Sequence, residues 1–128
     1  MAARPVVRPL VVAPCGPVAD TPVRKSRVQA ALQRLEASGV SPAMDESVWN
    51  KSGYLAGSDE ARLGALLAAL ESDAPLVWAA RGGYGAMRLL PALERALKDQ
   101  TCERVFLGFS DLTALFPLLA RRGFRCVH

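Results

Sequence analysis

The feature that most constrains this 128-residue chain is a regular alternation between short apolar runs and longer segments with helical spacing. Short continuous apolar runs are typical of strands that are buried on both faces of a parallel sheet. We therefore expect four strands, and residues 40–44 are a fifth candidate that Pro42 weakens. The four runs occupy residues 9–13, 75–80, 105–107 and 124–127.

The segments between these runs carry apolar residues at positions i, i+3, i+4 and i+7, which lie on one face of a helix. Thr21, which proline follows, and Ser58, which two acidic residues follow, are typical helix N-caps. Residues 87–97 resume the helical spacing, and we expect Pro91 to interrupt it. The clearest stripes are Val28-Ala31-Leu32-Leu35, Leu63-Leu66-Leu67-Leu70 and Leu112-Leu115-Phe116-Leu119.

Strands that alternate with helices predict an α/β fold, in which helices flank a parallel sheet as in Rossmann-like and flavodoxin-like domains. Functional sites of such sheets lie in loops at the carboxyl ends of the strands. Two loops have that place here, residues 81–85 and residues 108–111. Because the last strand stops one residue before the end of the sequence, we expect residues 1–128 to be one domain of a longer chain.

The net charge of +4 does not indicate a nucleic-acid partner, because the basic residues are dispersed and no run of five like charges occurs. Aromatic residues make up only 6% of the chain and do not alternate with basic residues as a base-stacking surface requires. The apolar start is too short for a membrane span and is broken by prolines. We therefore expect neither a nucleic-acid partner nor a membrane partner.

The three cysteines, Cys15, Cys102 and Cys126, are widely spaced and form no CxxC pair. An odd number at such spacing argues against a disulfide framework and predicts reduced, mostly buried thiols in a cytosolic protein. The single histidine is too few to complete a zinc site with these cysteines. The sequence therefore indicates no metal centre.

Ser110 follows the buried run 105–107 and precedes a helical stripe, so it lies in a sharp turn between a strand and a helix. A hydroxyl in that place projects from the edge of the sheet, and the start of the helix can stabilise a developing oxyanion. The match to the nucleophile-elbow pattern G-x-S-x-G is incomplete, because Leu112 replaces the last glycine. The alternative interpretation is that Ser110 or Asp111 caps the following helix.

The loop at residues 81–85 has the sequence Arg-Gly-Gly-Tyr-Gly. Its consecutive glycines, Gly82 and Gly83, let backbone amides approach a ligand closely and hold an oxyanion or a phosphate. The loop matches no nucleotide-binding pattern, so a turn without a ligand is the alternative. Arg81 either anchors a carboxylate or faces solvent. Trp78, in the middle of the preceding run, is expected in the core.

Four segments resemble, in order and at suitable spacing, the LD-carboxypeptidase family of serine peptidases, which includes the microcin C immunity peptidases. The resemblance implies a two-domain enzyme in which residues 1–128 form the amino-terminal, nucleophile-bearing domain, while the carboxyl-terminal domain is absent from this chain. It also implies a homodimer in the cytoplasm and no metal or organic cofactor. The segments are VVAPCGP, YLAGSDEARLGALLAAL, WAARGGYGAMRLLPAL and GFSDLTAL, which together span nearly the whole chain.

The same resemblance assigns the nucleophile to Ser110 and the oxyanion-stabilising amides to Asp111 and to the Gly82-Gly83 region. A glutamate and a histidine of the second domain would complete a Ser-His-Glu triad. The implied function is a serine carboxypeptidase that cleaves the amide between L- and D-centres of murein tetrapeptides and releases D-alanine in cell-wall recycling. The isolated domain is expected to be inactive. The alternatives are an immunity-type hydrolase of aminoacyl-nucleotide analogues and a non-catalytic domain that binds small molecules.

The sequence makes a specific prediction at three further positions. Pro117 lies inside the helix expected after Ser110, so that helix is expected to kink or to begin its regular part later. Met87 replaces the small polar residue expected after the glycine loop, which would alter a pocket there. His128 ends the last strand, near Ser110 in a parallel arrangement, but the resemblance places the catalytic base in the second domain. An isolated domain would also expose apolar surface and self-associate.

Overall fold

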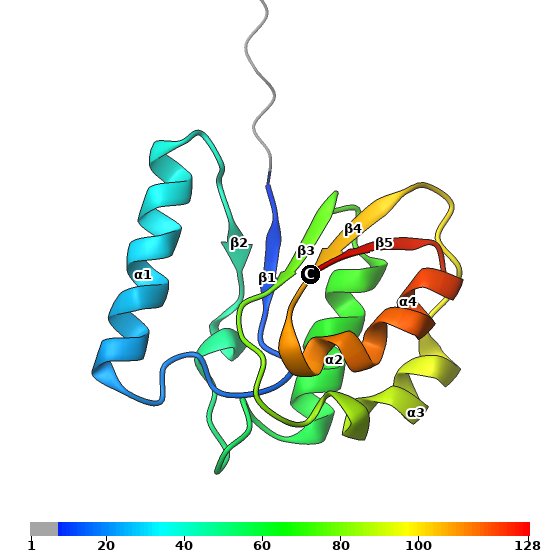
Figure 1. The fold of residues 1–128 in the computed structure, drawn as a ribbon, viewed down its shortest axis with the longest axis horizontal. Helices are drawn as coiled ribbons and strands as arrows, with labels where there is room; N and C mark the ends of the chain where they lie inside the picture. Colours follow the sequence, from blue (N-terminus) through cyan, green and yellow to red (C-terminus); the bar gives the residue numbers. More distant parts are fainter. Residues whose placement is uncertain (1–7) are drawn as a thin grey trace, which may run out of the picture.

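A computed structural model describes residues 8–128, and in it five parallel strands form a sheet (Figure 1). The strand order is β2-β1-β3-β4-β5. This is the flavodoxin-like order, in which a site is expected where the direction of winding reverses, between β1 and β3. The predicted α/β fold is therefore confirmed. The strands are β1 (Leu10–Val12), β2 (Ala43–Met44), β3 (Leu76–Ala79), β4 (Arg104–Leu107) and β5 (Phe124–Val127).

The helices begin where the sequence predicts them. The Thr21 hydroxyl accepts a hydrogen bond from the Arg24 amide at 3.1 Å, and the Ser58 hydroxyl accepts one from the Ala61 amide at 3.1 Å. Both predicted N-caps are therefore confirmed. The helices are α1 (Pro22–Ala37), α2 (Asp59–Glu71), α3 (Ala86–Ala96) and α4 (Phe116–Arg121), with 3-10 helices η1 (Glu46–Trp49) and η2 (Ser110–Leu115).

Pro91 and Pro117, the two prolines expected to disturb a helix, differ in their effect. The segment after β4 is a 3-10 helix up to Leu115 and becomes α-helical only at Phe116. Pro117 is therefore in the first turn of α4, where its missing N–H leaves no helical bond unmade. The predicted later start of that helix is confirmed. The interruption predicted at Pro91 was wrong, because α3 continues through Pro91 to Ala96.

One face of the sheet carries the main apolar core. Val77 and Phe106 lie on this face with no exposed surface, and α2, α3, η2 and α4 pack against it. The predicted stripe on α2 is confirmed, since Leu66 and Leu70 are fully buried. Because the chain runs from the carboxyl ends of β2, β3 and β4 toward α2, α3 and η2, the loops on the way come together at the same edge of the sheet.

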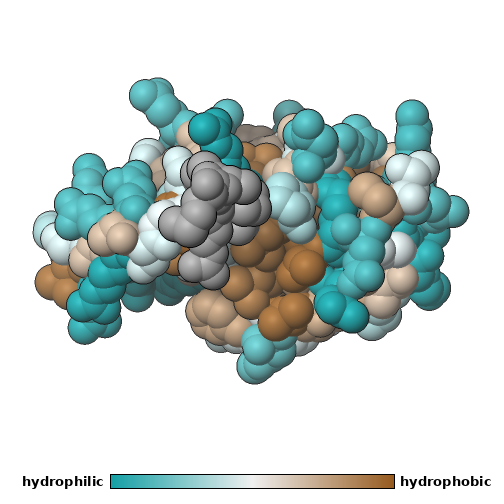
Figure 2. All heavy atoms as spheres, turned by 90° about the horizontal axis from the view of Figure 1, so that it is seen from above, coloured by the Kyte–Doolittle hydropathy of each residue, from teal (hydrophilic) through white to brown (hydrophobic). Residues whose placement is uncertain are grey.

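The other face of the sheet is less completely covered. Leu76, Trp78 and Leu107 alternate with buried residues along β3 and β4, are half-buried, and belong to neither apolar cluster. The predictions that residues 75–80 are buried on both faces and that Trp78 is in the core were therefore wrong. The helix α1 lies beside β2 at one side of the molecule and buries none of its residues (Figure 1). Figure 2 shows apolar side chains gathered at the surface near the middle of the molecule.

Candidate active site

The two loops singled out in the sequence lie against each other at the carboxyl edge of the sheet. A Cβ atom placed on Gly82 would lie 2.9 Å from the Cβ of Ser110 and 3.3 Å from its hydroxyl oxygen. The loop after β1 joins them, because the Gly16 amide donates a hydrogen bond to the Gly82 carbonyl at 3.0 Å. The structure therefore brings the predicted nucleophile and the predicted glycine loop together.

Ser110 has an unusual backbone conformation. Its φ is +56°, and among residues 8–128 it is the only residue other than glycine with a positive φ. A non-glycine residue in a sparsely populated region costs on the order of 1–3 kcal/mol, and such residues cluster at active sites. Ser110 is exposed and is the first residue of η2, just after β4. This strained strand-to-helix turn is the geometry of a nucleophile elbow.

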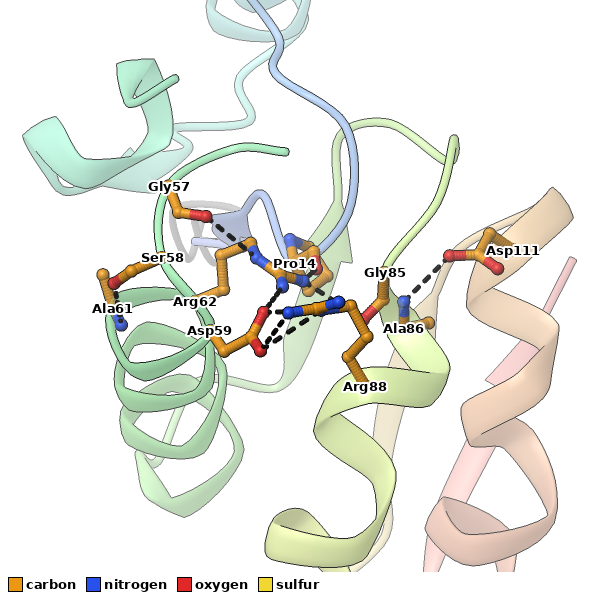
Figure 3. Close-up of polar contacts among 10 residues, drawn as sticks. All are labelled: Pro14, Gly57, Ser58, Asp59, Ala61, Arg62, Gly85, Ala86, Arg88 and Asp111. Carbon is orange, nitrogen blue, oxygen red and sulfur yellow. Dashed lines mark hydrogen bonds and ion pairs between the residues drawn. The ribbon is translucent and has the colours of Figure 1, made fainter. Parts of the chain in front are cut away.

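The capping alternative for Ser110 and Asp111 is wrong. The N-cap of η2 is Phe109, and no side-chain hydrogen bond caps this helix. The Asp111 carboxylate instead accepts a hydrogen bond from the Ala86 amide at 2.9 Å, at the start of α3 (Figure 3). Asp111 therefore links the turn that contains Ser110 to the end of the glycine loop.

Backbone amides with no protein acceptor border Ser110. Asp111 is the second residue of η2, and amides in the first turn of a helix have no acceptor in their own helix. Within residues 8–128, the Gly82 and Gly83 amides donate no hydrogen bond to the protein. Gly83 has a φ of +113°, which strongly favours glycine. These amides are of the kind that stabilises an oxyanion.

Cys15 is buried next to Asp111, below the turn that contains Ser110. Burial and, secondly, the neighbouring Asp111 carboxylate raise the pKa of the Cys15 thiol from its ordinary value of 9.0 to about 12. The folded protein therefore keeps this proton at pH values where the unfolded chain loses it. The stability that the thiol contributes is present below the unfolded pKa and is lost as the pH rises through the folded pKa.

At about pH 8, where a thiolate is the reacting species, iodoacetamide is expected to modify the exposed Cys102 and to leave Cys15 unmodified in the folded protein. Addition of urea should make Cys15 reactive. Mass spectrometry of peptides from both samples measures the difference. Equal labelling of Cys15 and Cys102 without urea would contradict the buried, protonated state.

Arg81 has partners within the protein. Its guanidinium donates a hydrogen bond to the Pro17 carbonyl and lies 3.8 Å from the Asp20 carboxylate. Asp20 also forms an ion pair with Arg24. The hydrogen bond from Arg24, and then the positive charges of Arg24 and Arg81, lower the pKa of Asp20. Arg81 therefore stabilises the loop between β1 and α1. Its side chain remains 30% exposed, so substrate contact stays a prediction.

Arg62 is a further residue of this site that the sequence patterns did not predict. Its guanidinium is fully buried below the glycine loop, where it donates to the carbonyls of Pro14, Gly57 and Gly85 (Figure 3). It also forms an ion pair with Asp59. A signal was present, because Arg62 stands four residues before Leu66 and therefore on the buried face of α2. A charged residue on such a face needs several hydrogen-bond partners.

His128 follows β5 and is exposed. The end of β5 lies beside the end of β4, since the Gly108 amide donates to the Val127 carbonyl at 3.0 Å. Ser110 is two residues beyond Gly108. Among residues 8–128, however, Ser110 and His128 form no hydrogen bond with each other. The structure therefore shows no activating contact between them.

Neither a metal cluster nor a membrane-spanning helix is found among residues 8–128. Between residues 8 and 128, no three histidine, cysteine or acidic side chains gather closely enough to hold a metal ion. In the same part of the chain, none of the helices has the length and apolar character that crossing a membrane requires.

The amino-acid sequence matches a known protein family over most of its length. A sequence model described as the LD-carboxypeptidase N-terminal domain matches residues 10–128. The chain belongs to the LD-carboxypeptidase family. The murein tetrapeptide carboxypeptidase of Pseudomonas aeruginosa is 36% identical over 102 residues, which are 79% of this chain and 33% of that protein. The resemblance inferred from the four segments is confirmed.

Solved structures of MccF-like proteins share the fold. The MccF-like protein of Streptococcus pneumoniae in complex with AMP has a TM-score of 0.78 and 26% identity over 94% of this chain and 36% of its own. The microcin C7 self-immunity protein MccF in complex with aspartyl sulfamoyl adenosine has a TM-score of 0.76 and 20% identity over 98% of this chain and 37% of its own. The chain therefore spans about a third of the length of these relatives.

Proposed function

We propose that this chain is the nucleophile-bearing, amino-terminal domain of a cytoplasmic serine LD-carboxypeptidase, a two-domain hydrolase in its complete form. The observation that carries the proposal is the strained φ of +56° at Ser110, directly against Gly82. A residue that only links a strand to a helix has no need of this strain. A non-catalytic binding domain would leave the strain unexplained.

In the proposed reaction, the Ser110 hydroxyl oxygen attacks the carbonyl carbon of the L,D-amide and gives its proton to a general base. The carbonyl becomes a tetrahedral oxyanion, which the amides of Asp111 and of Gly82 or Gly83 stabilise. Collapse breaks the C–N bond, and the leaving amine takes the proton from the base. Water then hydrolyses the ester on Ser110 and regenerates the hydroxyl.

The base and its orienting carboxylate are proposed to be a histidine and a glutamate of the carboxyl-terminal domain. The protein needs no metal or organic cofactor in this scheme, because an activated serine and backbone amides supply the chemistry. Arg81 is proposed to help to position the substrate, and its 30% exposure leaves that contact accessible. The complete enzyme is proposed to form a homodimer.

The proposed substrate is a murein tetrapeptide, from which the terminal D-alanine is released. The support is the relative from P. aeruginosa, which is a murein tetrapeptide carboxypeptidase and shares 36% of the aligned residues. The second candidate is an aminoacyl-nucleotide analogue, as hydrolysed by an immunity-type enzyme. The complex of the MccF-like protein of Streptococcus pneumoniae, which is 26% identical, with AMP favours this candidate.

The proposal is tested by hydrolysis of an L,D-tetrapeptide and of aspartyl sulfamoyl adenosine, followed by chromatography. The chain alone is expected to release neither D-alanine nor aspartate, because no base contacts Ser110 within residues 8–128. The same chain joined to its carboxyl-terminal domain is expected to release D-alanine. Turnover by the chain alone would place the base within it and make His128 the leading candidate. Preference for the nucleotide analogue would favour the second candidate.

A further inference from the structure

The glycine loop has little means of holding its own shape. Three of the four residues from Gly82 to Gly85 are glycine, and Gly83 and Gly85 have φ values of +113° and +110°. Glycine loses more conformational freedom on folding than any other residue. Catalysis by backbone amides requires that they be held in place before the reaction. The loop must therefore be fixed by groups outside it.

Arg62 binds the carboxyl-terminal end of this loop. Its Nη1 atom donates to the Gly85 carbonyl at 3.1 Å, in the turn that leads into α3 (Figure 3). The packing is close, since a Cβ atom on Gly85 would lie 2.8 Å from the same nitrogen. The adjacent residue, Ala86, is bound by the Asp111 carboxylate. The exit of the loop is thus fixed from α2 and from the turn of the nucleophile.

The amino-terminal end of the loop depends on Arg62 through the segment after β1. The same Nη1 atom donates to the Pro14 carbonyl at 2.6 Å. Two residues later, the Gly16 amide donates to the Gly82 carbonyl at 3.0 Å. Gly82 in turn lies against Ser110. One guanidinium therefore holds both the segment that binds Gly82 and the residue that ends the loop.

The remaining donors of Arg62 anchor the guanidinium itself. Its Nε atom donates to the Gly57 carbonyl at 3.2 Å, and its Nη2 atom pairs with the Asp59 carboxylate. Asp59 also accepts three hydrogen bonds from Arg88, at 2.8, 2.9 and 3.2 Å. Burial of this charge costs desolvation free energy that an apolar side chain at the same helix position would not cost. The directional bonds to three loops, and not the burial of α2, explain the arginine.

We propose that Arg62 is a positioning residue of the hydrolytic site, which holds the Gly82 and Gly83 amides at the distance from Ser110 that oxyanion stabilisation requires. This role rests on the proposed function. Arg62 touches no reacting atom and acts through the backbone of the Pro14–Gly16 segment and of Gly85. Nη1 binds Pro14 and Gly85 while Nε and Nη2 bind Gly57 and Asp59. Lysine has a single nitrogen with three donors, so it cannot make these four contacts at once.

The test compares Arg62→Lys with Arg104→Lys. Arg104 is a matched control, because it is also buried, at 4% exposure, and also binds backbone carbonyls. It binds Ala69 at 3.0 Å and Ala74 at 2.7 Å, at the amino-terminal edge of the sheet and away from the glycine loop. The variant Arg62→Gln, which removes the buried charge, is the substitute should the lysine variant not fold.

Hydrogen exchange and enzyme kinetics distinguish the two arginine variants. Amide hydrogen exchange, measured by NMR on the present chain, is expected to accelerate at least tenfold at Gly16 and Ala86 in Arg62→Lys and to stay unchanged there in Arg104→Lys. In the enzyme joined to its carboxyl-terminal domain, kcat on the L,D-tetrapeptide is expected to fall by roughly 10- to 100-fold in Arg62→Lys, with KM changed less than about threefold. Arg104→Lys should leave both constants within about twofold.

Unchanged exchange at Gly16 and Ala86 would overturn the positioning role, and so would an unchanged kcat in an active enzyme. An equal fall of kcat in both arginine variants would also overturn it, since that pattern reports general destabilisation. Failure of the proposed function would give a different combination of results. The wild-type enzyme would then release no D-alanine, while the exchange rates in Arg62→Lys would still show that the loop depends on Arg62.

Discussion

Replacement of Ser110 by alanine or by glycine is expected to remove hydrolysis of the L,D-tetrapeptide in the complete enzyme, while the two variants differ in stability. Both lack the attacking oxygen, so kcat should fall by at least about 10⁴-fold. The φ of +56° at Ser110 strongly favours glycine. A left-handed conformation costs a residue with a Cβ atom roughly 1–2 kcal/mol. The glycine variant should therefore unfold with a free energy about 1 kcal/mol above that of the alanine variant.

Ser38 provides the control for this comparison. It is the C-cap residue of α1 and has a φ of −89°, which residues with a Cβ atom adopt without strain. Ser38→Gly should be less stable than Ser38→Ala by roughly 0.5–1 kcal/mol, because glycine loses more freedom on folding. Urea unfolding of the four variants measures both differences. The same order of stability at both positions, or turnover by either Ser110 variant, would count against a strained nucleophile.

The features that the sequence predicts well are those set by neighbouring residues. The strand runs, the caps at Thr21 and Ser58, and the turn at Ser110 each depend on a few adjacent side chains, and the structure contains all of them. The burial of Trp78 depends instead on which face of the sheet the helices cover. An apolar run has the same composition whether one face or both faces are covered, so hydropathy does not distinguish the two cases.

The missed parts of the site depend on contacts between distant residues. The Asp111 carboxylate binds an amide 25 positions earlier, and Arg62 binds a carbonyl 48 positions earlier. Neither contact follows from local propensity. In the sequence, an aspartate after a strand fits a helix cap, and the spacing that puts Arg62 on the buried face of α2 does not tell which carbonyls it binds. Only the meeting of three loops at the carboxyl edge of the sheet gives both side chains their roles.

Gly82→Ala is expected to damage both stability and turnover. The added Cβ would lie 2.9 Å from the Ser110 Cβ and 3.2 Å from the Phe109 carbonyl oxygen. Real Cβ atoms essentially never approach a neighbour at 2.9 Å, so the glycine loop and the nucleophile turn have to separate. Overpacking of this kind costs roughly 1–3 kcal/mol of unfolding free energy. A displacement of about 1 Å between nucleophile and oxyanion donors lowers kcat by about 100-fold.

Gly64→Ala separates the site effect from the general effect of adding a methyl group. Gly64 lies within α2, and a Cβ atom there meets nothing within 4 Å. Alanine should therefore stabilise the helix by roughly 0.5–1 kcal/mol and leave kcat unchanged. Thermal unfolding and tetrapeptide turnover of both variants give the result. If Gly82→Ala kept full kcat, the Gly82 backbone would not need to lie against Ser110, and the oxyanion site would have to be formed by amides other than those of this loop.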